Sequence, residues 1–136
     1  FIAWFGAYLV NFVGYILVPA IGPRYFYPEL FQNPLEGFFI APLLHSILSS
    51  YQATAEDCFP SGHTAISWII GLVALKLVPR YGRWACIAAL GITGATLFLR
   101  YHYIIDVMAA FVLVWIGLYW SGWFQIKTSS PEKTIL

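Results

Sequence analysis

Charged residues are scarce in this sequence. They make up 10% of the 136 residues, whereas hydrophobic residues make up 60%. A soluble domain usually carries about 25% charged residues, so the composition predicts an integral membrane protein and argues against an ordinary soluble enzyme. The formal net charge of +1 and the lack of any basic run argue against a nucleic-acid partner.

The sequence also lacks a starting methionine, a recognisable signal peptide and internal repeats. It begins at Phe1 inside a hydrophobic run that has neither a charged leader nor a small-residue cleavage pattern. We therefore expect that further N-terminal sequence precedes this chain. A single membrane-embedded catalytic domain is expected over residues 1–126, followed by a polar tail at residues 127–136.

Four long apolar stretches predict an all-α, integral membrane helical bundle. A spanning helix needs about 20 apolar residues, and prolines and polar turns separate the stretches. The expected transmembrane helices are Phe1–Val18, Thr64–Val78, Trp84–Leu99 and Tyr103–Trp123, with a turn at Arg80–Arg83. A short apolar piece, Phe38–Ile47, interrupts the proline-rich region after the first span. We expect this piece at the membrane interface or as a re-entrant segment.

The alternating direction of the spans predicts which polar residues share a membrane face. The first and third spans end on the side where the second and fourth begin. The polar residues expected on that side are Arg24, His63, Arg100, His102 and Asp106. The basic residues expected on the other side are Lys76, Arg80, Arg83, Lys127 and Lys133. The positive-inside rule makes the second side cytoplasmic, so the site is expected on the periplasmic, lumenal or extracellular face.

The stretch Pro60-Ser61-Gly62-His63 stands at the start of the second predicted span. Ser61 is a suitable N-cap, and Gly62 would leave the backbone uncovered, so the first N–H groups could bind an anion with the help of the helix dipole. His63 in the first turn would then lie beside this anion. The stretch predicts a phosphate site with a proton donor attached, and an ordinary helix start is the alternative interpretation.

A second polar group opens the last predicted span. His102 and Asp106 are four residues apart, so on a helix they would share one face. A carboxylate that accepts the N–H of one imidazole nitrogen leaves the other nitrogen as nucleophile or base. Arg24 and Arg100 could clamp phosphate oxygens, because a guanidinium matches phosphate in a forked geometry. The alternatives are a structural His102–Asp106 pair and an interfacial anchor at Arg100.

The two cysteines are expected on opposite sides of the membrane. Cys58 precedes the second span, and Cys86 lies near the start of the third. A bilayer core of about 30 Å would separate them, which is far beyond the reach of a disulfide. We therefore predict neither a disulfide nor a catalytic role for these two residues.

These residues resemble the type 2 phosphatidic acid phosphatase superfamily, which includes lipid phosphate phosphatases, undecaprenyl diphosphate phosphatases and vanadium haloperoxidases. The second motif of that family, Pro-Ser-Gly-His, is intact at residues 60–63. The histidine and aspartate of its third motif match His102 and Asp106. The resemblance implies that His102 forms a phosphohistidine and that Asp106 orients it.

The same resemblance extends to the leaving group and the phosphate. It implies that His63 protonates the leaving group, and that Ser61 and the Gly62 N–H bind the phosphoryl oxygens. It implies no metal and no other cofactor. It also implies a six-helix protein, of which this chain would supply the last four helices.

Two parts of the family pattern are missing. The Ser-Arg pair of the third motif falls on Ala95 and Thr96, and the first motif is not found. Arg100 and Arg24 are the candidates to replace the two absent arginines. This looser pattern is similar to the branch that includes inositol phosphorylceramide synthases. The sequence therefore favours a membrane phosphatase acting on a lipid phosphate or diphosphate, of the phosphatidic acid or isoprenyl diphosphate type. A lipid phosphotransferase and a non-catalytic protein that retains the fold are the alternatives.

Overall fold

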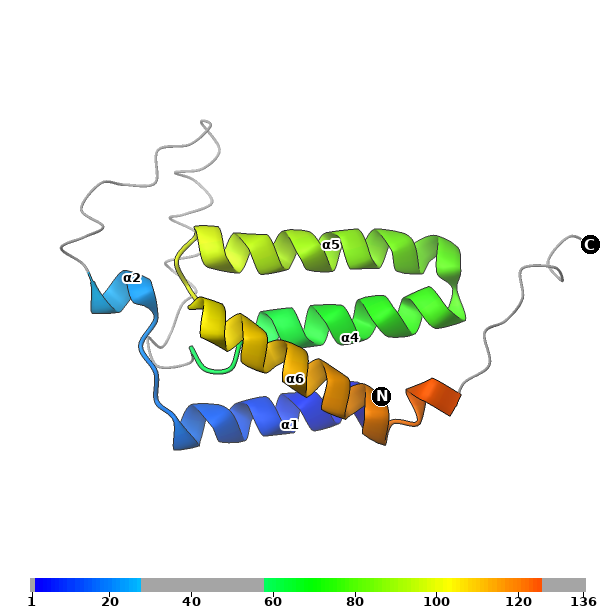
Figure 1. The fold of residues 1–136 in the computed structure, drawn as a ribbon, viewed down its shortest axis with the longest axis horizontal. Coiled ribbons are helices and arrows are strands. Elements are labelled where there is room, and N and C mark those ends of the chain that lie inside the picture. The colour runs from blue at the N-terminus through cyan, green and yellow to red at the C-terminus, as the bar shows by residue number, and fades with distance from the viewer. Residues whose placement is uncertain (1, 28–57, 126–136) are drawn as a thin grey trace, which may run out of the picture.

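Four long helices form the described part of the chain in a computed structural model (Figure 1). The structure describes residues 2–27 and 58–125. The elements are α1 (Ile2–Leu17), α2 (Pro23–Phe26), α4 (Gly62–Leu77), α5 (Pro79–Phe98), α6 (Ile104–Trp120) and the short 3-10 helix η2 (Trp123–Gln125). These residues contain no strand, so the all-α prediction is confirmed. The predicted interfacial segment Phe38–Ile47 and the tail 127–136 lie outside the described residues.

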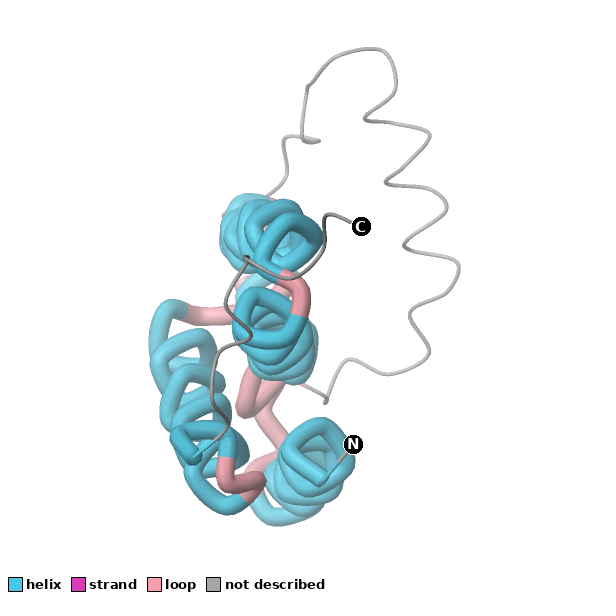
Figure 2. Tube along the Cα trace, turned by 90° about the vertical axis from the view of Figure 1, so that its right-hand side faces the viewer, coloured by secondary structure: helices cyan, strands magenta, loops and turns pink. Residues whose placement is uncertain are grey.

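The long helices run alongside one another with alternating direction. Helix α4 lies between α5 and α1, and α6 crosses over α4 and α1 (Figures 1 and 2). The C-terminal ends of α1 and α5 therefore lie at the same end of the bundle as the N-terminal ends of α4 and α6. This is the arrangement that four alternating helices predict, and it gathers the polar motifs at one end.

Small side chains allow the helices to pack closely. The buried apolar core consists of Ala3, Ala7, Ala65, Ile69, Ala110, Val114 and Leu118. Alanine and glycine at helix contacts let two backbones approach each other. Gly82 of α5 is such a position, because a Cβ atom there would overlap the backbone of Leu75 in α4. The positions of α4 and α5 relative to each other are fixed by this contact.

Helix α5 begins earlier than the sequence predicted. A turn was expected at Arg80–Arg83 and a helix from Trp84, but α5 starts at Pro79 and includes both arginines. Proline suits the first position of a helix, because its missing N–H would have no intrahelical partner there. Val78 alone separates α4 from α5, so the predicted turn is wrong.

Helix α5 ends in a Schellman motif next to the predicted site. The N–H of Arg100 donates to the Leu97 carbonyl, and the N–H of Tyr101 donates to the Thr96 carbonyl, both at 3.0 Å. Arg100 has a left-handed φ of 62° at the position where glycine is usual. For a residue with a Cβ atom this conformation costs about 1–2 kcal/mol. The reversal turns the chain back toward α4 just before His102.

The four predicted spans correspond to α1, α4, α5 and α6. Helices α1 and α4 have 16 residues each and α6 has 17, whereas α5 has 20 residues and carries two arginines in its first turns. Among residues 2–27 and 58–125, no helix combines the length and the apolar composition that crossing a membrane requires.

Candidate active site

His102 lies in the short link between α5 and α6. Its N–H donates to the Thr96 carbonyl (3.3 Å), and α6 begins two residues later at Ile104. The prediction that His102 and Asp106 share one helix face is therefore wrong, because only Asp106 is helical. Their side chains still meet, with His102 Nδ1 and Asp106 Oδ2 3.7 Å apart.

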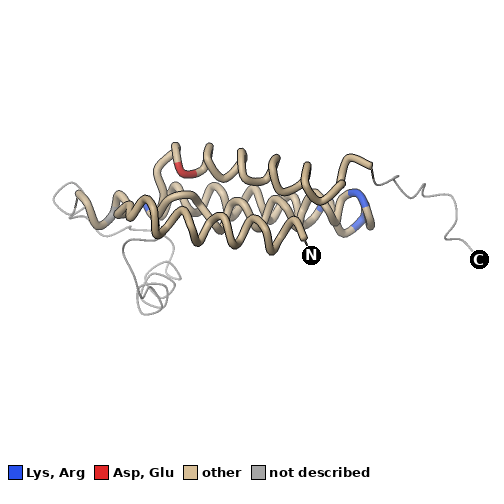
Figure 3. Tube along the Cα trace, turned by 90° about the horizontal axis from the view of Figure 1, so that it is seen from below, with Lys and Arg blue, Asp and Glu red and all other residues tan. Residues whose placement is uncertain are grey.

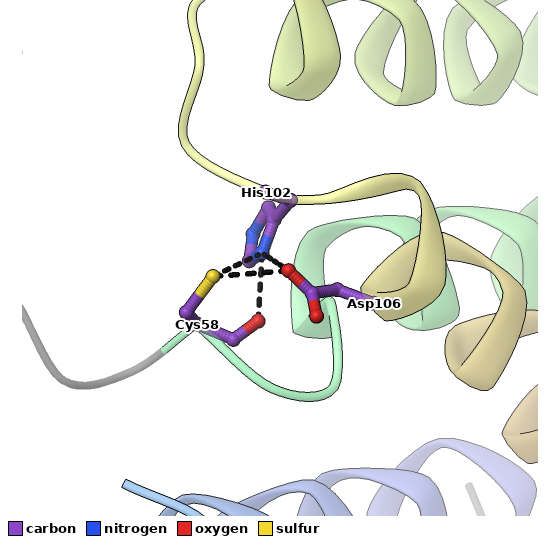
Figure 4. Close-up of side chains that lie close together, drawn as sticks. All are labelled: Cys58, His102 and Asp106. Carbon is purple, nitrogen blue, oxygen red and sulfur yellow. Dashed lines mark hydrogen bonds and ion pairs between the residues drawn. The ribbon is translucent and has the colours of Figure 1, made fainter. Parts of the chain in front are cut away.

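The imidazole of His102 is held by a backbone carbonyl. Nδ1 lies 2.8 Å from the carbonyl oxygen of Cys58 (Figure 4). A carbonyl oxygen can only accept a hydrogen bond, so Nδ1 carries the proton. In the neutral ring the lone pair then resides on Nε2. The sequence assigned this orienting role to Asp106, but the shorter contact is made by the main chain of Cys58.

Asp106 joins the start of α6 to the preceding segments. Its Oδ2 accepts hydrogen bonds from the Tyr103 N–H (2.7 Å) and from the Cys58 thiol (3.0 Å). The side chain is buried, and the first turn of a helix stabilises a negative charge there. Asp106 therefore ties the first turn of α6 to Cys58 and to the link that carries His102.

Cys58 is the residue of this site that the sequence did not reveal. Its thiol lies 3.0 Å from Asp106 Oδ2, 3.7 Å from His102 Nδ1 and 3.3 Å from the Tyr101 carbonyl oxygen. Figure 4 shows the three side chains pointing toward one another. Neither Cys58 nor Cys86 forms a disulfide, as predicted. The sequence predicted no catalytic role for Cys58, and the structure places its thiol in contact with both site residues.

Ser61 caps α4 as the sequence predicted. Its hydroxyl accepts from the Thr64 N–H (3.4 Å) and donates to Thr64 Oγ1 (3.0 Å). The residue has no exposed surface, and its hydroxyl is engaged in the helix start. The N–H of Ser61 donates to the Asp106 carbonyl (3.2 Å), which joins the starts of α4 and α6.

Gly62 is required by the close approach of α1. A Cβ atom at this position would lie 2.7 Å from Asn11 Oδ1 and 3.0 Å from the Tyr15 hydroxyl. The buried Asn11 side chain also donates to the Pro60 carbonyl (2.8 Å). Helix α1 therefore holds the loop that precedes His63. Gly62 is buried, so the prediction of an uncovered backbone at this residue is wrong.

His63 extends from the first turn of α4 and is exposed. The centroid of its ring lies 6.3 Å from that of His102, and the two ring planes make an angle of 56°. One phosphoryl group could contact both rings at this separation. The structure thus brings His63 together with His102 and Asp106, although the chain separates them by about 40 residues.

The predicted arginine ligands lie at the same end of the bundle. Arg24 belongs to α2, which begins against the site: a Cβ atom on Gly22 would lie 2.7 Å from the Tyr101 carbonyl oxygen and 3.9 Å from Cys58 Sγ. Arg100 is partly exposed and stands two residues before His102. The backbone thus brings the start of α2 and the end of α5 to the link that carries His102.

Charge is distributed unevenly between the two ends of the bundle. Asp106 is the one acidic residue among those described, and it lies at the end opposite Lys76, Arg80 and Arg83 (Figure 3).

One set of side chains in the described ranges could hold a metal ion. Cys58 Sγ, a nitrogen of His102 and a carboxylate oxygen of Asp106 all lie within 4.8 Å of one another. Sulfur, nitrogen and oxygen donors of this kind are typical zinc ligands. The sequence predicted no metal in the reaction, and this set includes His102, the predicted nucleophile.

Fold and site together define an all-α protein in which two histidines from separate segments meet at the N-terminus of a helix. The family model of the PAP2 superfamily matches residues 17–129. The chain belongs to this superfamily, and the predicted family is confirmed.

A curated relative supports the same assignment. A "PA-phosphatase related-family protein" of Dictyostelium discoideum is 36% identical over 136 aligned residues, which cover 98% of this chain and 24% of that protein. The chain thus spans about a quarter of the length of this relative. No solved structure matches the chain significantly.

Proposed function

We propose that the protein is a membrane phosphatase that hydrolyses a lipid phosphate or diphosphate through a phosphohistidine at His102. The observation that carries the proposal is the geometry of the two histidines. His63 lies 6.3 Å from His102 between ring centroids, and the contact of Nδ1 with the Cys58 carbonyl leaves the lone pair of His102 on Nε2. Family membership favours phosphatase chemistry for this pair.

The reaction would proceed in two steps. In the first, Nε2 of His102 attacks phosphorus, the bond from phosphorus to the lipid oxygen breaks, and His63 donates a proton to that oxygen. In the second, water attacks the phosphohistidine, His63 accepts a proton from the water, and phosphate leaves. The imidazole of His102 is positively charged in the intermediate, and Asp106 Oδ2 at 3.7 Å would stabilise that charge.

Phosphate binding would involve the start of α4 at the exposed His63 and the two arginines. The first N–H groups of a helix have no intrahelical partner and attract anions. The cap at Ser61 and the close packing at Gly62 fix the position of this helix start. We assign the charge-assisted contacts with phosphoryl oxygens to Arg100 and Arg24. Metal and other cofactors have no part in this scheme.

The proposal includes an integral membrane location, with the site on the periplasmic, lumenal or extracellular face. Large apolar side chains face outward on α6 and are more than half exposed: Ile105, Met108, Val112, Trp115 and Tyr119. Small and polar residues such as Asn11, Thr93 and Thr96 are buried instead. An apolar exterior around a small-residue interior is typical of helices in lipid. A lipid phosphate could then reach the site sideways from the bilayer.

Two histidine variants test the proposal. We expect His102→Ala to abolish release of phosphate from phosphatidic acid or isoprenyl diphosphate. His63→Ala should lose more activity with a poor leaving group, such as an alkyl alcohol, than with a good one, such as a nitrophenol, because only the poor one needs a proton. Cys86→Ser, which alters a residue of α5 outside the site, is the control. Unchanged turnover in both histidine variants would contradict the proposal.

An alcohol acceptor separates hydrolysis from transfer. The position of the family's third-motif arginine is taken by Thr96, and this departure is the observation that favours a phosphotransferase as the second candidate. If the enzyme is a transferase, added inositol or glycerol should increase lipid turnover while little phosphate is released. Orthovanadate, which resembles the pentacoordinate phosphorus, should inhibit either activity.

A further inference from the structure

We propose that Cys58, His102 and Asp106 form a zinc site that inhibits the protein by moving the proton of His102 from Nδ1 to Nε2. Cys58 precedes α4 in the sequence, whereas His102 and Asp106 follow α5. None of the reaction steps proposed above uses the Cys58 thiol. Binding of zinc is independent of the proposed reaction. Inhibition rests on the proposed function.

The distances between the donor atoms suit one tetrahedral ion. Zinc binds sulfur at about 2.3 Å, nitrogen at about 2.0–2.1 Å and oxygen at about 2.0–2.2 Å, which places tetrahedral ligands about 3.4–3.6 Å apart. The observed separations are 3.7 Å for Sγ–Nδ1 and for Nδ1–Oδ2, and 3.0 Å for Sγ–Oδ2. The short third distance is a thiol hydrogen bond, which would lengthen once the metal replaces its proton.

Burial and charge also favour a divalent ion that binds a thiolate. Only 3% of Cys58, 6% of His102 and 2% of Asp106 is exposed. A thiolate and a carboxylate together balance the two positive charges of zinc, so the occupied site would be neutral in this buried position. One of the backbone carbonyl oxygens of Tyr101 and Cys58, which lie 3.3 Å from Sγ and 2.8 Å from Nδ1, can supply the fourth ligand. A thiolate ligand selects zinc over magnesium.

Binding would displace the proton that orients the nucleophile. Cys58 loses its thiol proton to solvent, because the metal binds the thiolate. His102 must present a lone pair at Nδ1, so its proton moves to Nε2 and the hydrogen bond to the Cys58 carbonyl is lost. Nε2 then carries hydrogen and cannot attack phosphorus. The active and the zinc-bound forms thus differ in the tautomer of one imidazole.

Cobalt tests the site without any activity measurement. Co²⁺ can replace zinc, and a thiolate ligand gives a charge-transfer absorption band in the near ultraviolet. In purified Cys86→Ser protein Cys58 is the single cysteine, so we expect Co²⁺ to produce this band and Zn²⁺ to remove it. No band in this variant would overturn the proposal, as would a band in Cys58→Ser protein that is as strong as in the wild type.

Turnover tests the inhibitory effect. Micromolar Zn²⁺ should inhibit the wild type and Cys86→Ser, a chelator should restore their activity, and millimolar Mg²⁺ should have no effect. Cys58→Ser, compared with its own activity without zinc, should need at least about 10-fold more Zn²⁺ for half inhibition. A cobalt band without inhibition by zinc would overturn the proposal that zinc inhibits the protein by moving the proton of His102. A protein with no turnover at all would contradict the proposed function, while the cobalt result would still decide on the site.

Discussion

The left-handed backbone at Arg100 allows stability and activity to be tested separately. Arg100 occupies the C′ position of the Schellman motif that ends α5, with φ at 62°. Glycine adopts this conformation without a steric cost, whereas any residue with a Cβ atom is strained. An arginine at this position is expected to persist if its side chain contributes something that glycine cannot. We expect that contribution to be a contact with the substrate phosphate.

Two substitutions distinguish the backbone from the side chain. Arg100→Ala removes the guanidinium and keeps the strain, whereas Arg100→Gly removes both. Strain of about 1–2 kcal/mol, reduced by about 0.5–1 kcal/mol for the greater flexibility of unfolded glycine, leaves a net gain of about 0–1.5 kcal/mol, centred on roughly 0.75 kcal/mol. The glycine variant should therefore be more stable than the alanine variant by this amount.

Chemical denaturation and steady-state kinetics provide the two measurements. The two variants should differ in free energy of unfolding, but both should lose the same activity, by about 10- to 100-fold in kcat/KM for a charged hydrogen bond of about 1.5–3 kcal/mol. Arg100→Lys should recover part of it. If both variants turn over the lipid phosphate at the wild-type rate, Arg100 is an interfacial anchor. If the glycine variant is the less stable of the two, the strain argument is wrong.

Two further predictions concern the residues around the histidines. Cys58→Ala removes the weak thiol donor to Asp106 but keeps the carbonyl that holds His102, so kcat/KM should fall only about 10-fold, from a bond of about 1.5 kcal/mol; equal activity would mean that the thiol does not position the carboxylate. Gly62→Ala forces a Cβ atom against Asn11 and should destabilise the fold by about 1–3 kcal/mol. In a double-mutant cycle with Asn11→Ala, measured by denaturation, the double variant should lose less stability than the sum of the two single losses, by at least about 0.5 kcal/mol.

Much of the fold could be predicted from local features of the sequence. The four apolar stretches predicted α1, α4, α5 and α6, and Ser61 predicted the start of α4, because capping and apolar runs are local properties. The prediction of a turn at Arg80–Arg83 was wrong because arginine and glycine in a short polar stretch suit a turn as well as a helix start. Packing of Gly82 against α4 decided in favour of the helix, and this contact is between two helices.

The site was predictable where side chains define it and not where the backbone does. Motif residues and alternating helix direction placed His63, His102 and Asp106 at one end of the bundle. Several contacts that hold them are made by carbonyl groups: that of Cys58 with His102, that of Thr96 with the His102 N–H, and that of Asp106 with Ser61. Every residue has a carbonyl, so such contacts leave no signal in the sequence.

The missing arginine of the third motif has a structural counterpart. Thr96 stands at its position, is buried, and donates its hydroxyl to the Thr93 carbonyl (2.8 Å) within α5. Its own carbonyl accepts from the N–H groups of Tyr101 and His102, so position 96 still holds His102 through the main chain. A positive charge can then come from Arg100, which the same Schellman motif holds next to His102. The turn thus conserves the placement of His102 and shifts the cationic side chain by four residues.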